Sequence, residues 1–240
     1  MALEKNNSIG GQDYQKQAAY YDTLYSDKDY ASEVKIISNF IKEYPLNNQR
    51  TLLDVGCGTG NHLEYFKQQY FVEGLDISSS MLEIAREKLS SVRFYQSDMS
   101  DFSLSKKYDV ITCLFGAIGW TKTLEKMRKS VLTMANHLND NGLLIVEPWF
   151  SSNTWQSGIV STTSIDNGSL QITRTDISFN EGLDFYFKVR DPSGVSCFKE
   201  RHKIGLFTLD EYSSAFRDIG LDLRYDSYGV NGRGLFIANK

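Results

Sequence analysis

Ten residues, Leu52–Asn61 (LLDVGCGTGN), decide the fold of this chain of 240 residues. Their apolar start predicts a buried strand, and the three glycines that follow turn the chain sharply into a helix beginning near His62. Because glycine has no side chain, a ligand can lie directly against the main chain of this loop. Asp54 closes the strand just before the first glycine. The stretch therefore predicts a ligand-binding turn between a strand and a helix.

A second apolar run, Phe71–Asp76, predicts the neighbouring strand and ends in an acid about twenty residues after the glycine loop. A carboxylate there can accept hydrogen bonds from both hydroxyls of a ribose. The dinucleotide fingerprint requires Gly or Ala at the sixth loop position, where this chain has Asn61. The order Asp-x-Gly-x-Gly-x-Gly instead resembles motif I of class I S-adenosylmethionine-dependent methyltransferases. S-adenosylmethionine is therefore the favoured cofactor, and NAD is the alternative.

Composition and charge argue against several classes of protein. A hydrophobic share of 41% with only 3 Pro indicates a folded globule, with room for one domain and an elaboration. The net charge of −4 argues against a nucleic-acid partner, because such proteins usually carry a basic stripe. The 3 Cys and 3 His are scattered, so we expect neither a metal site nor a disulfide framework. No signal-peptide pattern and no membrane-length apolar run is present, which predicts a cytoplasmic protein without a membrane partner.

Strands and helices alternate through the first half of the chain. The pattern predicts strands over 51–55, 71–76, 93–96, 109–114 and 142–147, with helices over 62–69, 81–89 and 124–138. This rhythm predicts a parallel, Rossmann-like sheet with helices on both faces. Ligands of such sheets bind at the carboxyl ends of the strands, which gathers several segments around one crevice. They are Gly56–Gly60, Asp76-Ile77, Asp98-Met99, Phe115–Trp120 and Pro148–Phe150.

The N-terminal segment is helical in pattern from residue 14 to residue 44 and rich in tyrosine. Five tyrosines occur in seventeen residues: Tyr14, Tyr20, Tyr21, Tyr25 and Tyr30. A tyrosine ring attracts cations such as a sulfonium, so we expect residues 1–48 to form a helical lid. Amphipathic packing against the domain is the alternative interpretation.

Period-two alternation follows residue 150 and predicts three or four antiparallel strands over 151–205. This insert can roof the acceptor site, or it can be a structural flap or dimer surface. Residues 49–150 and 206–240 then complete a seven-stranded α/β core, with a helix from Thr208 and strands over 221–227 and 235–238. Arg233 lies in a glycine-flanked turn between these strands, where it can bind a phosphate or remain a solvated loop charge.

From Tyr14 to Ile237 the chain resembles the N-methyltransferases of dTDP-amino-sugar pathways, the N,N-dimethyltransferases that finish sugars such as desosamine and mycaminose. The matching segments are Asp13-Tyr14, Tyr21-Asp22, Asp29-Tyr30, Leu52–Gly60, Val72–Leu75, Asp98-Met99, Val146–Trp149, Arg174, Leu206–Thr208 and Gly232–Phe236. The glycine loop specifies only a methyltransferase. Glu147–Trp149, the insert and the Arg233 turn narrow the resemblance to this subgroup.

The resemblance implies S-adenosyl-L-methionine as cofactor and a nucleotide sugar as substrate, and it leaves a homodimer open. On the cofactor side it implies Tyr21, Tyr30, Asp54, Gly56, Cys57, Gly58, Asp76, Ile77, Met81, Asp98, Met99 and the end of the fourth strand, Leu114 or Phe115. On the substrate side it implies Tyr14, Trp149, Phe150, Ser151, Arg174 and Arg233. Asp98 can instead cap a turn.

One departure from the family concerns the proton acceptor. Relatives of this kind can carry a histidine after the Ile-Gly pair that follows the fourth strand, whereas Ile118-Gly119 precedes Trp120 here. We expect no other histidine to replace it, which makes Tyr14 the candidate acceptor or relay and Trp120 a pocket wall. Two alternative functions stay open: methylation of another small amine or a carboxylate, and a binding or assembly protein without turnover.

Overall fold

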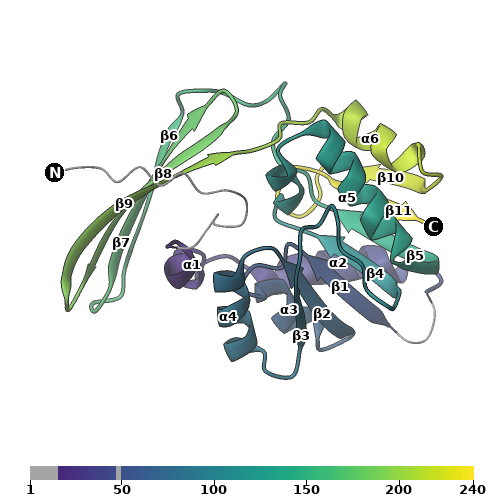
Figure 1. The fold of residues 1–240 in the computed structure, drawn as a ribbon, viewed down its shortest axis with the longest axis horizontal. Coiled ribbons are helices and arrows are strands. Elements are labelled where there is room, and N and C mark those ends of the chain that lie inside the picture. Colours follow the sequence, from purple (N-terminus) through teal and green to yellow (C-terminus); the bar gives the residue numbers. More distant parts are fainter. Residues whose placement is uncertain (1–15, 47–49) are drawn as a thin grey trace.

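A seven-stranded sheet forms the centre of the computed structural model, which describes residues 16–46 and 50–240 (Figure 1). Its strands are β1 (Thr51–Val55), β2 (Phe71–Asp76), β3 (Arg93–Gln96), β4 (Tyr108–Cys113), β5 (Leu138–Val146), β10 (Asp222–Asp226) and β11 (Leu235–Asn239). The spatial order is β10-β11-β5-β4-β1-β2-β3. β1 to β5 run parallel, whereas β11 runs antiparallel to both of its neighbours. The predicted α/β fold class is confirmed. Tyr14 lies outside the described residues.

The first three strands agree with the sequence prediction residue for residue, and the next two differ. β4 begins and ends one residue earlier than predicted. β5 begins at Leu138 rather than at Gly142, because the chain crosses a bulge before the regular ladder starts. Asn141 has a left-handed φ of 61° in that bulge. Its polar neighbours made the segment look like a turn.

Helices cover both faces of this sheet. α2 (Tyr30–Lys42), α3 (Asn61–Phe66) and α4 (Ser79–Lys88) pack on one face, and η1 (Ala117–Thr121), α5 (Leu124–Asn136) and α6 (Leu209–Arg217) pack on the other. Ser78 caps α4, since its Oγ accepts a hydrogen bond from the Met81 N–H (3.3 Å). α3 and α5 end earlier than predicted.

The N-terminal segment is not one continuous helix, so that prediction was wrong. α1 (Ala18–Leu24) is separated from α2 by a short turn. Asp29 caps α2, because its Oδ1 accepts a hydrogen bond from the Ser32 N–H (2.9 Å). A capping aspartate satisfies the first N–H groups of a new helix, and so the chain restarts there.

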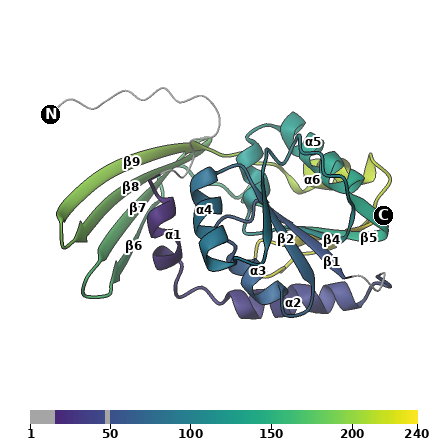
Figure 2. The same cartoon turned by 60° about the horizontal axis from the view of Figure 1, so that its bottom comes forward.

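The predicted insert is confirmed as a second, antiparallel sheet of four strands. They are β6 (Val160–Asp166), β7 (Gln171–Phe179), β8 (Gly182–Asp191) and β9 (Gly194–Lys203). Figures 1 and 2 both place α1 between this sheet and α4. Leu24 of α1 packs with Ile172, Phe185 and Phe187 on the inner face of the insert. The insert and α1 therefore stand over one end of the central sheet.

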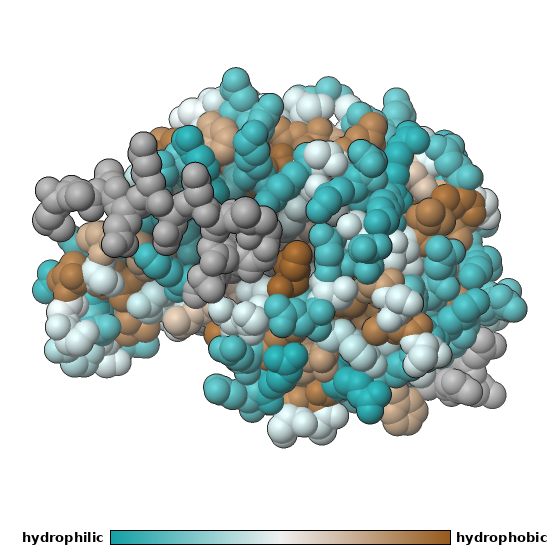
Figure 3. All heavy atoms as spheres, viewed as in Figure 1, coloured by the Kyte–Doolittle hydropathy of each residue, from teal (hydrophilic) through white to brown (hydrophobic). Residues whose placement is uncertain are grey.

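The surface in Figure 3 is largely hydrophilic, with apolar residues broken into small patches. In the part of the chain that the structure describes, no helix is long and apolar enough to cross a membrane.

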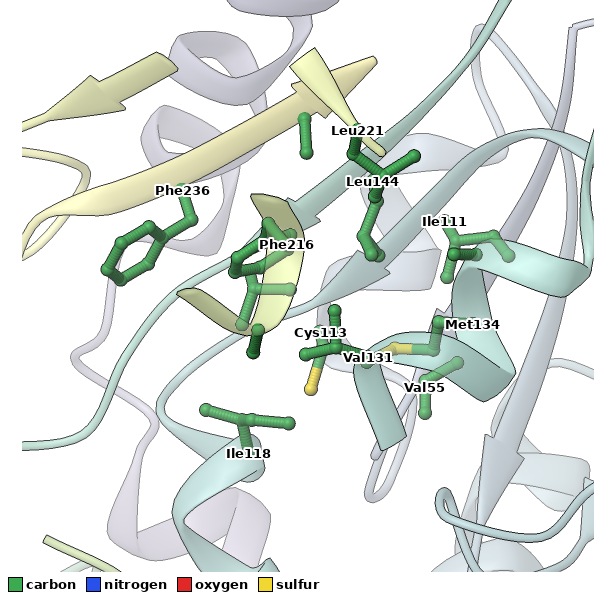
Figure 4. Close-up of a cluster of buried hydrophobic side chains, with 14 of the residues drawn as sticks. Val55, Ile111, Cys113, Ile118, Val131, Met134, Leu144, Phe216, Leu221 and Phe236 are labelled. Atoms are coloured by element: carbon green, nitrogen blue, oxygen red, sulfur yellow. The ribbon is translucent and has the colours of Figure 1, made fainter. Parts of the chain in front are cut away.

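Aromatic rings fill the core beneath β11. Figure 4 shows Phe216 of α6 and Phe236 of β11 among this cluster of buried side chains. The Phe236 ring centroid lies 5.5 Å from that of Phe216 and 5.1 Å from that of Tyr212. Only 1% of Phe236 is exposed. It therefore packs β11, the strand that follows the Arg233 turn, against α6.

Replacing Phe236 with alanine should lower the free energy of unfolding by about 3–5 kcal/mol, because a large cavity would remain. Tyr228, which is 73% exposed near the same strand, provides the control. Tyr228→Ala should change the free energy of unfolding by less than about 0.5 kcal/mol. Urea denaturation of both variants measures the difference, and equal effects would contradict this description of the core.

Candidate active site

The glycine loop turns the chain at the carboxyl end of β1 through left-handed conformations. Gly56, Gly58 and Gly60 have φ of 73°, 54° and 80°. The Gly56 N–H donates to the Leu75 carbonyl oxygen (2.7 Å), which joins the loop to β2. A Cβ on Gly56 would lie 2.7 Å from the Ala117 Cβ, whereas one on Gly58 would meet no heavy atom within 4 Å. The main chain at Gly58 is therefore open to a ligand.

Asp76 ends β2 beside this loop and holds the loop with its carboxylate. Oδ2 accepts a hydrogen bond from the Gly58 N–H (2.8 Å), and Oδ1 accepts one from the Ser78 N–H (2.9 Å). Both donors are neutral, and burial raises the pKa of Asp76. Each carboxylate oxygen has a second lone pair. The carboxylate therefore lies next to the open main chain with capacity for further hydrogen bonds.

A pocket opens between the glycine loop and the segment around α1. Its lining consists of Tyr21, Tyr30, Asp54, Gly56, Cys57, Gly58, Thr59, Asn61, His62, Leu114 and Phe115. It includes every cofactor residue that the sequence predicted in the lid, in the glycine loop and at the end of β4. The other predicted cofactor residues, Asp76, Ile77, Met81, Asp98 and Met99, follow β2 and β3 and do not line it.

Asp98 follows β3 and binds groups of the protein itself. Oδ1 accepts hydrogen bonds from the backbone N–H and the hydroxyl of Ser100, both at 2.8 Å. Lys126 Nζ lies 3.3 Å from Oδ2. Although partial burial opposes the change, these bonds hold the pKa of Asp98 below its ordinary value. This is the turn-capping arrangement that the sequence left open, and a contact between Asp98 and the cofactor stays a prediction.

Asp22 connects α1, part of the predicted lid, to the glycine loop through hydrogen bonds. Its carboxylate accepts hydrogen bonds from the Thr59 hydroxyl (2.5 Å) and the Asn61 side-chain amide (3.0 Å). Lys88 Nζ of α4 lies 2.8 Å from the same carboxylate and also donates to Asn61. Asn61, the residue that departs from the dinucleotide fingerprint, therefore has a structural purpose. It anchors the lid.

A buried ion-paired network lies behind the pocket. Lys28 pairs with Glu33, whose other oxygen lies 2.8 Å from His62 Nε2. The Lys28 ammonium also lies 4.5 Å from the ring centroid of Phe115 and 5.0 Å from that of Tyr30. Burial lowers the pKa of Lys28 to about 8. Sequence reasoning missed Lys28, because one lysine near a helix start resembles an ordinary surface charge.

Asp54 is 2% exposed at the floor of the pocket. Its Oδ1 accepts a hydrogen bond from the Thr112 hydroxyl (2.8 Å). Burial raises the pKa of Asp54 to about 6, and nearby His62 opposes the rise. A cation in the pocket would favour the ionised carboxylate.

Glu147, at the end of β5, fixes the pocket wall. It is 0% exposed, and its Oε2 accepts the N–H of Phe115 at 2.6 Å. Phe115 has a φ of 53°, which is strained for an aromatic residue. Oε1 accepts hydrogen bonds from Asn231 (3.0 Å) and from Arg233 Nη2 (2.5 Å). The sequence placed Glu147 only in a family motif and assigned it no role.

The two predicted phosphate-binding arginines are both paired with acids. The Arg233 guanidinium binds Glu147 and lies 5.3 Å from the ring centroid of Trp149 and 5.9 Å from that of Phe150. Arg174 of β7 binds Asp176 and donates from Nη1 to the Tyr25 hydroxyl (3.1 Å). Tyr25 in turn sets its ring edge against Phe115 at 5.3 Å. The structure thus gathers both arginines around one aromatic wall. Neither is a solvated loop charge.

One histidine does lie near Trp120, while the expectation that no histidine replaces the family's histidine as proton acceptor stays a prediction. The His202 ring of β9 lies 4.9 Å from the Trp120 ring, in an edge-on contact. Sequence reasoning missed it because the contact joins segments far apart in the chain. Ser151 lies in a turn where its N–H donates to Thr154 Oγ1 (3.3 Å). Among the described residues, no three His, Cys, Asp or Glu side chains are grouped to hold a metal ion.

Comparisons with known proteins show the family to which the chain belongs. A family model for a methyltransferase domain matches residues 52–142. The dTDP-3-amino-3,4,6-trideoxy-alpha-D-glucopyranose N,N-dimethyltransferase of Streptomyces venezuelae is 36% identical, over 92% of this chain and 96% of its own length. The chain belongs to the S-adenosylmethionine-dependent sugar N-methyltransferase family. The dTDP-4-amino-2,3,4,6-tetradeoxy-D-glucose N,N-dimethyltransferase of Saccharopolyspora spinosa is 35% identical, over 92% of this chain and 91% of its own.

A solved structure supports the same assignment of this methyltransferase. S-adenosylmethionine-bound CalS10, an amino pentose methyltransferase from Micromonospora echinaspora involved in calicheamicin biosynthesis, is similar with a TM-score of 0.81. It is 31% identical, and the match covers 99% of both chains. The cofactor of this methyltransferase is S-adenosylmethionine. The residues present fit it, because the main chain at Gly58 is open and, among the described residues, the donors to the buried Asp54 and nearby Asp76 carboxylates are neutral.

Replacing Asp22 with alanine should weaken S-adenosylmethionine binding by about tenfold, because the lid would lose a charged anchor on the glycine loop. Asp27 is an exposed acid of the same segment, and Asp27→Ala is the matched control. Isothermal titration calorimetry measures both dissociation constants. An unchanged affinity in Asp22→Ala, or an equal loss in both variants, would contradict the anchor.

The pH dependence of cofactor binding should report Asp54. Its raised pKa means that the folded pocket holds a proton below pH 6, and a bound sulfonium should displace that proton. The affinity for S-adenosylmethionine should therefore rise about tenfold from pH 5 to pH 7. S-adenosylhomocysteine, whose sulfur is neutral, should show a weaker dependence. In Asp54→Asn, calorimetry should find the same pH dependence of affinity for both ligands. A pH dependence that still differs between the two ligands in this variant would contradict the assignment to Asp54.

Proposed function

We propose that this chain transfers a methyl group from S-adenosylmethionine to the amine of a dTDP-linked amino-deoxy sugar. The extent of the similarity carries the proposal. The general methyltransferase match ends at residue 142, whereas the alignment with the first amino-sugar N,N-dimethyltransferase covers 92% of this chain. An alignment of that length must include most of residues 151–205, a segment that lies outside the general methyltransferase match. Residues 1–48 act as the lid, 151–205 as the acceptor roof, and 49–150 with 206–240 as the cofactor core.

The chain's own residues contribute alignment and exclusion of water. S-adenosylmethionine supplies an electrophilic methyl group, which the neutral sugar amine attacks in line. The Tyr21 and Tyr25 rings lie 4.7 Å apart, and Tyr25 packs edge-on against Phe115. This aromatic layer joins the lid to the end of β4 and keeps water from the reacting atoms. Because positive charge only moves from sulfur to nitrogen, orientation contributes most of the rate enhancement.

The acceptor side of the crevice is rich in aromatic surface. Trp149 packs edge-on against Phe150 (5.4 Å between ring centroids), and Trp120 stands on η1. Removing an amine from water favours its neutral form, which is the form that attacks. Trp149 Nε1 is buried and has no hydrogen-bond acceptor among the described residues. A sugar hydroxyl or phosphate oxygen would supply that acceptor.

Arg174 and Arg233 are the proposed diphosphate ligands. Arg233 donates hydrogen bonds from Nε and Nη2 to Glu147 Oε1. The N–H groups of Nη1 do not take part in these bonds and are the proposed donors to the diphosphate. Arg174 binds Asp176 while its guanidinium lies over the Tyr25 ring at 5.4 Å. Each acid holds its arginine in a fixed orientation, which lowers the entropy lost when a diphosphate binds.

Incubation with labelled S-adenosylmethionine and a panel of acceptors tests the proposed function. The panel contains 3-amino and 4-amino dTDP-hexoses, free amino sugars, small amines and small carboxylates. Methyl transfer to a dTDP-amino sugar, and not to the corresponding free sugar, is the expected result. Turnover of a small amine or carboxylate alone would replace the proposed substrate. Absence of all turnover would favour a binding protein.

Replacing Arg233 with alanine should raise the KM for the dTDP-amino sugar about tenfold or more, because a charged hydrogen bond contributes about 1.5–3 kcal/mol. The KM for S-adenosylmethionine should change much less. Asn231→Ala is the matched control, since it also removes a bond to Glu147 Oε1 but keeps the positive charge. Steady-state kinetics with each substrate varied separately measures both constants. Equal effects on the two substrates would remove the diphosphate role.

A further inference from the structure

One wall of the cofactor pocket contains a histidine that the sequence did not predict as a cofactor residue. His62 is the second residue of α3, directly after the glycine loop, and it lines the pocket together with Asp54 and Tyr30. Only 7% of the residue is exposed. No role assigned above to the pocket residues uses its imidazole.

Glu33 of α2 fixes which ring nitrogen of His62 carries the hydrogen. Glu33 is buried, and its Oε1 pairs with the ammonium of Lys28, so its side chain is a carboxylate that can only accept hydrogen bonds. Its Oε2 lies 2.8 Å from His62 Nε2. Nε2 must therefore carry the hydrogen, and the lone pair of the neutral ring lies on Nδ1.

Nδ1 of His62 is the ring atom that remains for a ligand. None of the described residues forms a hydrogen bond with it, and it is not one of the unpartnered polar atoms that the protein encloses. Because the ring lines the pocket, this lone pair is open to the pocket. Tyr30 packs edge-on against the imidazole, with 4.9 Å between the ring centroids, and so restrains the ring plane. The wall therefore presents one oriented hydrogen-bond acceptor.

The charges around this acceptor favour a cationic donor. Burial lowers the pKa of His62 to about 4, although the Asp54 carboxylate opposes the change. The ring is therefore neutral at pH 7 and does not repel a cation. Lys28 is paired with Glu33, whereas Asp54 accepts a hydrogen bond from the neutral Thr112 hydroxyl. A neutral acceptor close to a carboxylate without a paired cation suits an N–H donor that carries positive charge.

We propose that His62 Nδ1 accepts a hydrogen bond from the α-ammonium of S-adenosylmethionine and so positions the amino-acid end of the cofactor. The adenine amine and the ribose hydroxyls are also donors, but they are neutral. The sulfonium carries positive charge but has no hydrogen on sulfur. The α-ammonium has both properties. The inference rests on the cofactor of this methyltransferase and goes beyond the proposed function, because it does not depend on the acceptor.

The test compares two ligands that differ only in the α-amine. They are S-adenosylhomocysteine and its analogue with hydrogen in place of that amine. The unsubstituted enzyme should bind S-adenosylhomocysteine more tightly than the analogue. His62→Gln should reduce this preference about tenfold, because the glutamine amide can still donate to Glu33 but places no acceptor at the position of Nδ1. Isothermal titration calorimetry measures the four dissociation constants.

Two further variants separate the hydrogen bond from a general effect on the fold. His62→Asn places its amide oxygen near the position of Nδ1, so it should keep more of the preference than His62→Gln. Glu64→Gln changes an exposed residue of the same helix and should leave both affinities unchanged. An equal loss of affinity for both ligands in His62→Gln, or no loss for either, would overturn the proposed hydrogen bond.

A readout that needs no variant at position 62 uses the small number of histidines. With only 3 His in the chain, substitution of His137 and His202 assigns the remaining ¹⁵N-histidine signals to His62. S-adenosylhomocysteine should shift the Nδ1 signal of His62, and the analogue without the amine should shift it much less. Equal shifts with both ligands would overturn the inference. Failure of the enzyme to methylate any dTDP-amino sugar would overturn the proposed function and leave this inference in place.

Discussion

The buried carboxylate of Glu147 is the constraint on which the crevice depends. It joins the end of its own strand, β5, to two other segments: the backbone of Phe115 after β4, and Asn231 and Arg233 in the turn before β11. Holding Phe115 in a left-handed conformation costs of order 1–3 kcal/mol, and such strain persists only where neighbouring contacts enforce it. A fully buried carboxylate also needs its cation, because an unpaired buried charge costs about 3–5 kcal/mol. One residue thus fixes both the pocket wall at Phe115 and the guanidinium of Arg233.

Charge is distributed unevenly around this crevice. Among the described residues, the ion pairs around it include Lys28–Glu33, Arg174–Asp176 and Arg233–Glu147. The cofactor pocket differs, because Asp54 and Asp76 accept hydrogen bonds only from neutral donors within the described residues. Local negative charge therefore remains where the glycine loop is open. A sulfonium nucleoside, which carries positive charge at sulfur and a ribose diol, complements both features.

The sequence allowed the cofactor half to be predicted more completely than the acceptor half, for a physical reason. The cofactor half depends on local chemistry: glycines that permit left-handed turns, and an acid at the end of the next strand. The positions of these glycines and of this acid can be recognised within one short stretch of sequence. The bounds of β1, β2 and β3 were also predicted residue for residue. The break between α1 and α2 at Asp29 and the bulge at Asn141 each depend on a single residue. The spacing of apolar residues along the sequence does not reveal such positions. The partners of Arg233 and His202 come from distant segments, and one sequence holds no record of such pairs.

In the insert, the alternation of side chains between the two faces of each strand could still have indicated which residues share the inner face. A strand buried on one face alternates inner and outer residues, so Phe198, Glu200 and His202 share a side. An ionisable pair on the side expected to be apolar conflicts with packing, and such conflicts gather at functional sites. The same reasoning applies to Arg174 and Asp176 on β7, which also share the inner face. The inner face of the insert is therefore mixed: apolar rows on β8 that pack against α1, and ionisable pairs on β7 and β9 on either side of them. Packing alone does not account for those pairs, because two apolar side chains in place of each would pack without desolvating charge.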